Sequence, residues 1–175
     1  MRRYAVQYND FIIVDGTHNT VMYDLKLMPY TVVCALGKSV IAGFALDESE
    51  NGETVTDGLS MFNLGRAGST LMTDGGSAFP SAASEAQMHH ILCSQHFQRE
   101  VFSSAGGLAE NADYFKRDAN ALIFANFESI ERWHEKYQEC VSTYSAFPKA
   151  LSCIRNIYKS KEKVCKCFTS NCVPK

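Results

Sequence analysis

The 175-residue sequence predicts an α/β domain with a mixed five-stranded sheet, followed by a helical appendage. Two observations predict the sheet: short apolar runs end at turn residues, and helical segments separate the later runs from one another. A third observation predicts the appendage, because after residue 107 only helical periodicity remains. We therefore expect an α/β core over residues 1–107 and a helical appendage over residues 108–175.

The first three predicted strands form an antiparallel meander. Residues 11–14, FIIV, form a short buried strand that stops at an Asp-Gly turn. A second strand over residues 25–36 contains Pro29, and proline inside a strand predicts an edge position or a bulge. A two-residue Gly-Lys link joins it to a third strand over residues 39–46, which predicts a tight hairpin.

The rest of the predicted core alternates helices with strands. Residues 53–65 place apolar side chains on one helical face, and residues 69–73, STLMT, form the fourth strand. The next helix, over residues 77–87, has a proline suited to its first turn and a serine before it as a cap. The fifth strand, residues 88–93, leads into a third helix. The order β-β-β-α-β-α-β-α is that of a ribonuclease-H-like fold, in which three meandering strands precede parallel crossovers.

Three further helices are predicted in the appendage, over residues 109–125, 127–144 and 148–161. In the second of them, apolar residues recur at spacings of three and four, which predicts a buried stripe. These residues are Ile130, Trp133, Tyr137 and Val141.

The composition, 46% apolar and 21% charged, is typical of a globular domain. No apolar run approaches the roughly eighteen residues of a membrane-spanning helix. Asp10 precedes any apolar region, which argues against a secretory signal, so we expect an intracellular protein. For a chain with the resemblance described below, we expect the nucleus. Seven cysteines, an odd number, argue against a disulfide framework.

The net charge of −2 hides an uneven distribution. Residues 147–175 carry seven Lys or Arg side chains against a single glutamate, whereas the rest of the chain is acidic. A basic end of this kind can contact a DNA backbone through Lys159, Lys161 and Lys163. The alternative is that these side chains form the solvated face of a terminal helix.

Asp15 and Asp74 are candidate metal ligands. Each follows directly after a predicted buried strand and precedes a glycine. Ligand sites in open α/β sheets gather at strand ends, and two carboxylates converging on divalent cations form the core of a two-metal phosphoryl-transfer site. The alternative is that each Asp-Gly pair simply forms a turn. Their joint placement after the first and fourth strands favours the metal pair.

These segments together resemble the MULE family of Mutator-like transposases. The resemblance covers residues 10–102 in order and, more loosely, the helical region to residue 175. It depends on Asp-Gly-Thr after the first strand, Thr-Asp-Gly after the fourth and Cys-x-x-His after the fifth. It implies a DDE transposase catalytic core that uses two Mg²⁺ or Mn²⁺ ions on DNA and works as a homo-oligomer in a transposition complex.

The resemblance also implies roles for individual residues. Asp15 becomes the first catalytic acid and Asp74 the second, and Cys93 and His96 match the Cys-x-x-His motif. Residues three apart share a helical face, so this pair can bind a metal or buttress the site, or else be a buried cysteine and a packed histidine. The family's third acid is a glutamate beyond a helical insertion. We therefore expect it beyond Lys175 and expect this chain, as a partial copy, to be inactive alone.

Three alternatives stay open. Glu100, on the helix after the fifth strand, is the fallback third acid. Zinc is a weaker candidate cofactor, because cysteines gather near the end of the chain without a paired CxxC spacing. They are Cys165, Cys167 and Cys172. The rival function is a domesticated or decayed transposase-derived protein that associates with DNA or regulates transcription without catalysis, since domesticated relatives of this family act as transcription factors.

Overall fold

The computed structural model describes residues 7–16, 25–49, 51–105, 108 and 111–169. The chain divides into two compact units, which we call the sheet unit, ending at Leu92, and the helical unit, beginning at Cys93. The predicted boundary after residue 107 falls at a position outside the described residues. Helix α4 (Ser94–Ser104) lies in the helical unit.

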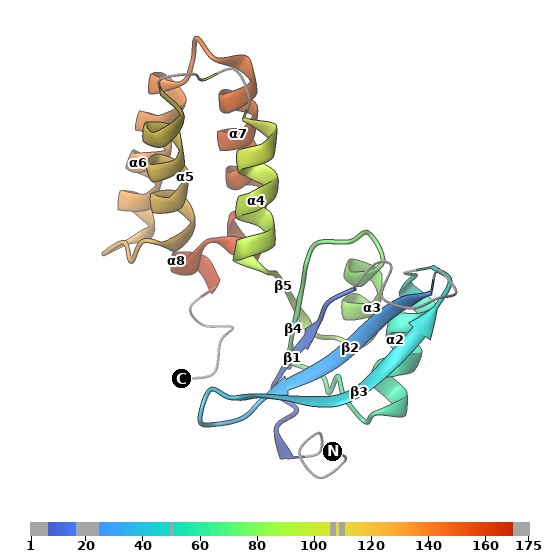
Figure 1. Cartoon of the computed structure of the whole chain (residues 1–175). Helices are drawn as coiled ribbons and strands as arrows, with labels where there is room; N and C mark the ends of the chain where they lie inside the picture. Colours follow the sequence, from blue (N-terminus) through green and yellow to red (C-terminus); the bar gives the residue numbers. More distant parts are fainter. Residues whose placement is uncertain (1–6, 17–24, 50, 106–107, 109–110, 170–175) are drawn as a thin grey trace. The chain divides into compact units, whose positions relative to one another are not determined.

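The sheet unit contains a mixed five-stranded sheet in the order β3-β2-β1-β4-β5 (Figure 1). Strands β1, β2 and β3 pair antiparallel, whereas β4 pairs parallel with β1 and β5 pairs parallel with β4. This order and these directions confirm the ribonuclease-H-like fold that the sequence predicts. The strands are β1 (Phe11–Val14), β2 (Lys26–Val33), β3 (Ser39–Asp47), β4 (Thr70–Thr73) and β5 (His89–Leu92).

The irregularity predicted at Pro29 lies close to the proline but not at it. The register between β2 and β3 shifts between Tyr30 and Thr31, and the extra residue belongs to β3, because Tyr30 pairs with Gly43 and Thr31 with Ile41. Pro29 itself pairs in register with Phe44, and β2 lies between β3 and β1, so it is not an edge strand.

The hairpin between β2 and β3 is longer than the two-residue turn that the sequence predicts. Strand β2 ends at Val33, and the N–H of Cys34 donates to the carbonyl of Lys38 at 2.9 Å. Gly37 lies in this turn with a φ of 70°, a conformation that L side chains rarely adopt. The sequence predicts a longer strand because Leu36 is apolar and continues the strand pattern. In the structure Leu36 lies in the turn and is 83% exposed.

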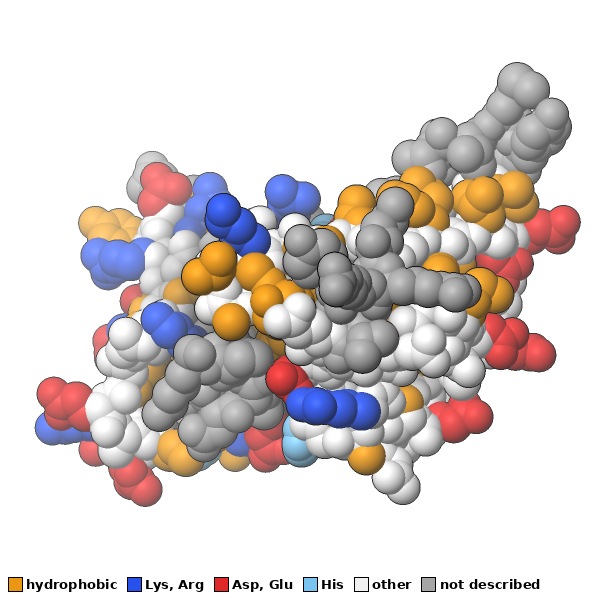
Figure 2. All heavy atoms as spheres, turned by 90° about the horizontal axis from the view of Figure 1, so that it is seen from below, with side chains coloured by type: hydrophobic (Ala, Val, Ile, Leu, Met, Phe, Trp, Pro, Cys, Tyr) orange, Lys and Arg blue, Asp and Glu red, His pale blue; other side chains and the backbone are white. Residues whose placement is uncertain are grey.

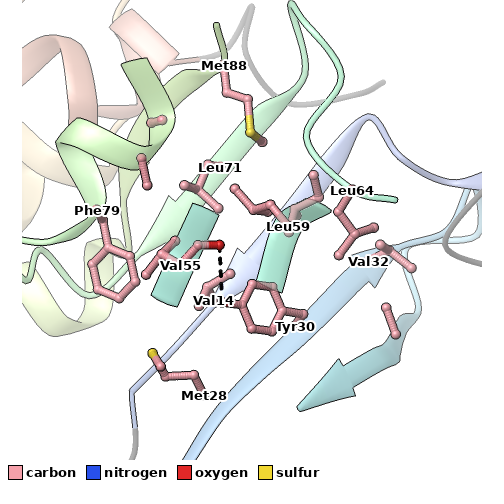
Figure 3. Close-up of a cluster of buried hydrophobic side chains, with 14 residues drawn as sticks. Val14, Met28, Tyr30, Val32, Val55, Leu59, Leu64, Leu71, Phe79 and Met88 are labelled. Carbon is pink, nitrogen blue, oxygen red and sulfur yellow. Dashed lines mark hydrogen bonds between the residues drawn. The ribbon is translucent and has the colours of Figure 1, made fainter. Parts of the chain in front are cut away.

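The core of the sheet unit lies between the sheet and helices α2 (Gly52–Met61) and α3 (Phe79–Glu85), which cover one of its faces. Val55 and Leu59 of α2 pack there, as their helical spacing predicts. The hydroxyl of Tyr30 donates to the carbonyl of Val55 at 3.3 Å (Figure 3). The strand residues that are fully buried in this core are Ile12, Val14, Met28, Tyr30, Val32 and Leu71.

The two helices begin differently. The side chain of Asn51, at the N-cap of α2, accepts a hydrogen bond from the N–H of Thr54 at 2.9 Å. Helix α3 has Ala78 at its N-cap and no side-chain cap, so the predicted serine cap is wrong. The proline in its first turn is where the sequence predicts it, and it supplies a preset φ instead.

The helical unit contains five helices among its described residues. Trp133 is fully buried at its centre, and the indole N–H donates to the carbonyl of Leu122 at 2.8 Å. The rings of Tyr137 and Phe168 lie 5.8 and 5.1 Å from the Trp133 ring. The helices are α4 (Ser94–Ser104), α5 (Ala112–Phe124), α6 (Ile130–Thr143), α7 (Pro148–Val164) and α8 (Lys166–Thr169).

The predicted stripe on α6 is only partly buried. Trp133 is inside, but Ile130 is 47% exposed because it is the first residue of the helix. Cys140 and the C-cap residue Tyr144 are buried on this side instead. Across both units, no helix among the described residues has the length and apolar character needed to cross a membrane.

The surface of the sheet unit combines acidic and hydrophobic side chains. Figure 2 shows acidic, basic and hydrophobic side chains together on one face of the molecule. Three hydrophobic side chains of the edge strand β3 are also exposed, namely Ile41, Phe44 and Leu46.

Candidate active site

Asp15 and Asp74 lie at the same end of two neighbouring strands. Each is the first residue after its strand, β1 or β4. The two strands are parallel, and their register pairs Ile13 with Met72. If this register continued for two more residues, it would bring the two aspartates side by side, at the spacing of about 4.8 Å between neighbouring strands. A cation can contact carboxylates from both strand ends at this spacing.

The alternation of side chains along β1 and β4 predicts that both carboxylates lie on the sheet face opposite α2 and α3. Side chains alternate between the two faces along a strand. Val14 and Leu71 pack in the core beneath the helices, and Thr73, two residues after Leu71, is buried as well. Asp15 follows Val14 and Asp74 follows Thr73, so the same alternation, continued past the strand ends, would turn both to the other face. Both are half-exposed.

The turn after β4 orients Asp74 through a set of short contacts. Oδ1 of Asp74 accepts a hydrogen bond from the N–H of Gly76 at 3.1 Å. Oγ1 of Thr73 accepts from the N–H of Gly75 at 3.3 Å and is hydrogen-bonded to Nε2 of His90 on β5 at 3.0 Å. Gly75 has a φ of 103°. Asp74 therefore also forms the turn that the alternative interpretation describes.

The Thr73–His90 contact was not anticipated from the sequence. Threonine precedes the aspartate, and histidine lies on the next strand, but only the β4–β5 register brings them together. That register pairs Leu71 with His90, which makes Thr73 the diagonal neighbour of the histidine.

The donor set fits a hard divalent cation. Among the described residues, no group donates a hydrogen bond to Asp15 or to Oδ2 of Asp74. Carboxylate oxygens suit Mg²⁺ and Mn²⁺, and Mg²⁺ binds through one or two protein carboxylates together with water and phosphate oxygens. Asp15 and Asp74 therefore provide the protein ligands that such an ion requires.

A third acid does not join this pair within the part of the chain that the structure describes. In that part, no group of three or more His, Cys, Asp or Glu side chains is positioned to hold a metal ion. Glu100, the fallback acid, is exposed on α4 in the helical unit. Its catalytic role stays a prediction.

Cys93 and His96 lie at the start of α4. Cys93 is the N-cap residue, and its side chain makes no capping hydrogen bond. Nδ1 of His96 is buried, and no hydrogen-bond partner for it exists among the described residues. A buried ring nitrogen without a partner costs free energy, so a ligand there would be favourable. Both interpretations of the Cys-x-x-His motif, metal ligand and packed pair, stay open.

The two described cysteines near the end of the chain differ in burial. Cys165 is fully buried, Cys167 is half-buried and Cys172 lies outside the described residues. Burial raises the pKa of the Cys165 thiol to about 12 and also raises the pKa of Cys167. Zinc binds the thiolate form, so an environment that favours the neutral thiol opposes zinc at Cys165.

The predicted DNA-contacting lysines lie near the end of α7. Lys159 and Lys163 are exposed, whereas Lys161 is half-buried with Nζ 4.2 Å from the centre of the Tyr158 ring. Arg155, which the sequence analysis missed, lies four residues before Lys159 and is exposed on the same helical face. The spacing of four between these cations is the signal that could have identified it.

No family model matches the sequence, and no curated protein matches it. Among solved structures, the chain is similar to the catalytic core domain of BIV integrase, with 11% sequence identity and a TM-score of 0.36. The match covers 85% of this chain and 82% of the integrase chain. The two backbones superpose only loosely at this TM-score. The fold assignment therefore depends on the strand order and pairing of the sheet itself.

Proposed function

We propose that the sheet unit is the catalytic core of a Mutator-like DDE transposase, acting on DNA phosphodiester bonds in the nucleus. The observation that carries this proposal is the position of Asp15 and Asp74 directly after adjacent parallel strands, at one end of the sheet. The motifs around them, Asp-Gly-Thr and Thr-Asp-Gly, support the family assignment.

In this function, Asp15 and Asp74 hold Mg²⁺ or Mn²⁺. Such an ion, when bound, lowers the pKa of an attacking water and stabilises the leaving oxygen. The chain itself contributes the positions of the two carboxylates. The Gly76 N–H fixes one oxygen of Asp74, and the contact between Thr73 and His90 ties its turn to the next strand. A carboxylate that is already oriented needs less reordering when the cation and a DNA phosphate arrive.

We further propose that this chain has no catalytic activity by itself. Its described residues provide two acids but no group of three metal ligands. Two carboxylates can bind a cation weakly, but an incomplete ligand set positions it poorly, and small misplacements cost large factors in rate.

The same observation favours a second candidate function, that of a domesticated or decayed DNA-associated protein. Such a protein keeps the ribonuclease-H-like fold and its contact with DNA but does not cleave it. The two functions differ in whether cations bound at Asp15 and Asp74 support catalysis once the ligand set is complete.

Cation binding provides the first test. Mn²⁺ affinity is measured by titration followed by electron paramagnetic resonance, with the full chain and with Asp15→Asn, Asp74→Asn and Asp57→Asn. Asp57 is an exposed carboxylate on α2 and serves as the matched control. We expect weak binding that both strand-end variants remove and the control keeps. Unchanged binding in Asp15→Asn and Asp74→Asn would refute the metal pair.

Nicking of supercoiled DNA provides the second test. We expect none from the chain with Mg²⁺ or Mn²⁺. Nicking that disappears in Asp74→Asn would mean that the chain is a complete enzyme, contrary to our proposal. Loss of that nicking in Glu100→Gln, with Glu128→Gln as the control, would then identify Glu100 as the third acid.

A further inference from the structure

A polar groove lies in the helical unit between the end of α4 and one face of α7. Its volume is about 410 Å³. Among the described residues, no aspartate or glutamate lines it. The polar side chains that line it are those of Ser104, Ser152, Arg155, Asn156 and Lys159.

These side chains are suited to an anion. A guanidinium and an ammonium carry only donors, and the hydroxyls and the amide can donate as well. Within the described residues, neither Arg155 nor Lys159 forms a salt bridge, unlike Lys116, Arg132 and Lys136 on α5 and α6. No salt bridge within the described residues therefore neutralises these two cations, although Glu100 on α4 is close enough to the lining residue Cys153 to raise the pKa of its thiol.

The cations form a row that extends past the groove. Arg155, Lys159 and Lys163 are exposed and four residues apart, so they share one face of α7. At a rise of about 1.5 Å per residue, the row is about 12 Å long along the helix axis. A single phosphate meets only part of such a row, whereas a chain of phosphates meets all of it. Lys161 is directed to the Tyr158 ring instead.

We propose that this groove and the row of cations on α7 bind the phosphate backbone of a nucleic acid, with Arg155 and Lys159 as the principal contacts. This surface deepens the proposed function, because it holds the DNA on which the sheet unit acts. Its evidence is nevertheless separate, since it depends on the side chains of α4 and α7 and on neither Asp15 nor Asp74.

The test compares two pairs of neutralised cations in the full chain. Arg155→Gln with Lys159→Gln removes the groove cations, and Lys116→Gln with Arg132→Gln removes the same charge from α5 and α6. Binding of a short labelled DNA duplex is followed by fluorescence anisotropy over a range of salt concentrations. We expect the groove pair to weaken binding about tenfold or more and to reduce the slope of log affinity against log salt by about two. The control pair should change both values little.

A second variant adds an acid without removing a cation. Ser152→Glu should weaken binding while circular dichroism and the thermal midpoint stay unchanged. Equal weakening by the groove and control pairs would overturn the proposal, because net charge alone would then explain binding. Unchanged binding in the groove pair or in Ser152→Glu would overturn it as well.

Two further measurements distinguish this proposal from a site for isolated phosphate and from the proposed metal pair. Inorganic phosphate should displace the duplex no better than sodium chloride of the same ionic strength; stronger displacement would mean a site for isolated phosphate and would contradict backbone binding. The double variant Asp15→Asn with Asp74→Asn should bind the duplex normally. The groove proposal is thus tested by the variants at Arg155 and Lys159, and the metal-pair proposal by the variants at Asp15 and Asp74.

Discussion

The sheet unit and the helical unit bury different kinds of side chain. The sheet unit packs mainly aliphatic residues beneath α2 and α3 and leaves Asp15 and Asp74 half-exposed at the strand ends. The helical unit packs aromatic rings around Trp133 and buries the thiols of Cys140 and Cys165. The strand-end carboxylates of the sheet unit are therefore open to water, whereas the thiols of Cys140 and Cys165 are not.

This difference bears on which predicted cofactor suits these two sets of side chains. A half-exposed carboxylate exchanges water for a cation without opening the fold. A buried thiol must first lose its proton, and burial raises the pKa of both Cys140 and Cys165 to about 12. The comparison favours an oxygen-bound divalent cation in the sheet unit over zinc in the helical unit.

The largest expected effect comes from the aromatic centre of the helical unit. Trp133→Ala should reduce the free energy of unfolding by about 3–5 kcal/mol, since it removes a fully buried ring and leaves the carbonyl of Leu122 without its donor. Urea unfolding followed by circular dichroism measures it. Tyr114→Ala, 58% exposed on α5, is the control and should change little. A cost near zero for Trp133→Ala would contradict the central role of this ring.

A smaller cost is expected where α2 approaches the sheet. A Cβ added at Gly58 would overlap the hydroxyl and ring of Tyr30. Gly58→Ala should therefore destabilise the sheet unit by about 1–3 kcal/mol, even though alanine favours helices. Ser60→Ala, at an exposed position of the same helix, is the control. A stabilised Gly58→Ala variant would mean that helix propensity outweighs the overlap.

Alkaline pH should weaken the helical unit first. The raised pKa of Cys140 and Cys165 means that the folded state keeps protons that the unfolded state releases. Their contribution is complete below the ordinary thiol value of 9.0 and is lost as pH rises toward 12, by roughly 1.4 kcal/mol per thiol and pH unit. In the sheet unit, burial raises the pKa of Tyr30 from 10.0 to about 12. Tyr30 therefore lowers the stability of this unit only above pH 10.

Trp133 is the single tryptophan of the chain, so its fluorescence reports on the helical unit alone. Unfolding midpoints in urea measured from pH 8 to about pH 10.5 should fall from near pH 9 onward. The double variant Cys140→Ala with Cys165→Ala should show a shallower fall. An identical fall in that variant would assign the effect to other groups.

Local patterns in the sequence were sufficient for the sheet. Short apolar runs bounded by turn residues predict each of the five strands, and their order with the intervening helices predicts the topology. The sequence itself places Asp15 and Asp74 after the first and fourth strands. Their position at neighbouring strand ends then follows, because in this topology β1 and β4 are parallel neighbours. The predicted boundaries fail where apolar residues continue past an element, as at Leu36.

Contacts that depend on register or on long-range packing were not predictable in the same way. The Thr73–His90 contact requires the β4–β5 register, and the exposure of Ile130 depends on where α6 begins. Helix α8 is a single short turn with no periodicity to detect. Arg155 belongs to the basic face of α7 through its spacing, but which face stays open to solvent is set by the packing of the other helices.

The smallest effects separate the two strand-end aspartates. Without a cation, Asp74→Ala should cost about 0.5–1.5 kcal/mol because Gly76 loses the acceptor for its N–H. Asp74→Asn keeps an oxygen at Oδ1 and should cost little, as should Asp15→Ala, to which no described residue donates a hydrogen bond. Thermal unfolding with a metal chelator measures these differences. With Mn²⁺ added, the unsubstituted chain should become more stable by mass action, whereas Asp74→Asn and Asp15→Ala should not. Equal costs for Asp15→Ala and Asp74→Ala under chelation would mean that both aspartates serve the fold. The contrast between the exposed ligands of the sheet unit and the buried thiols of the helical unit would then be lost.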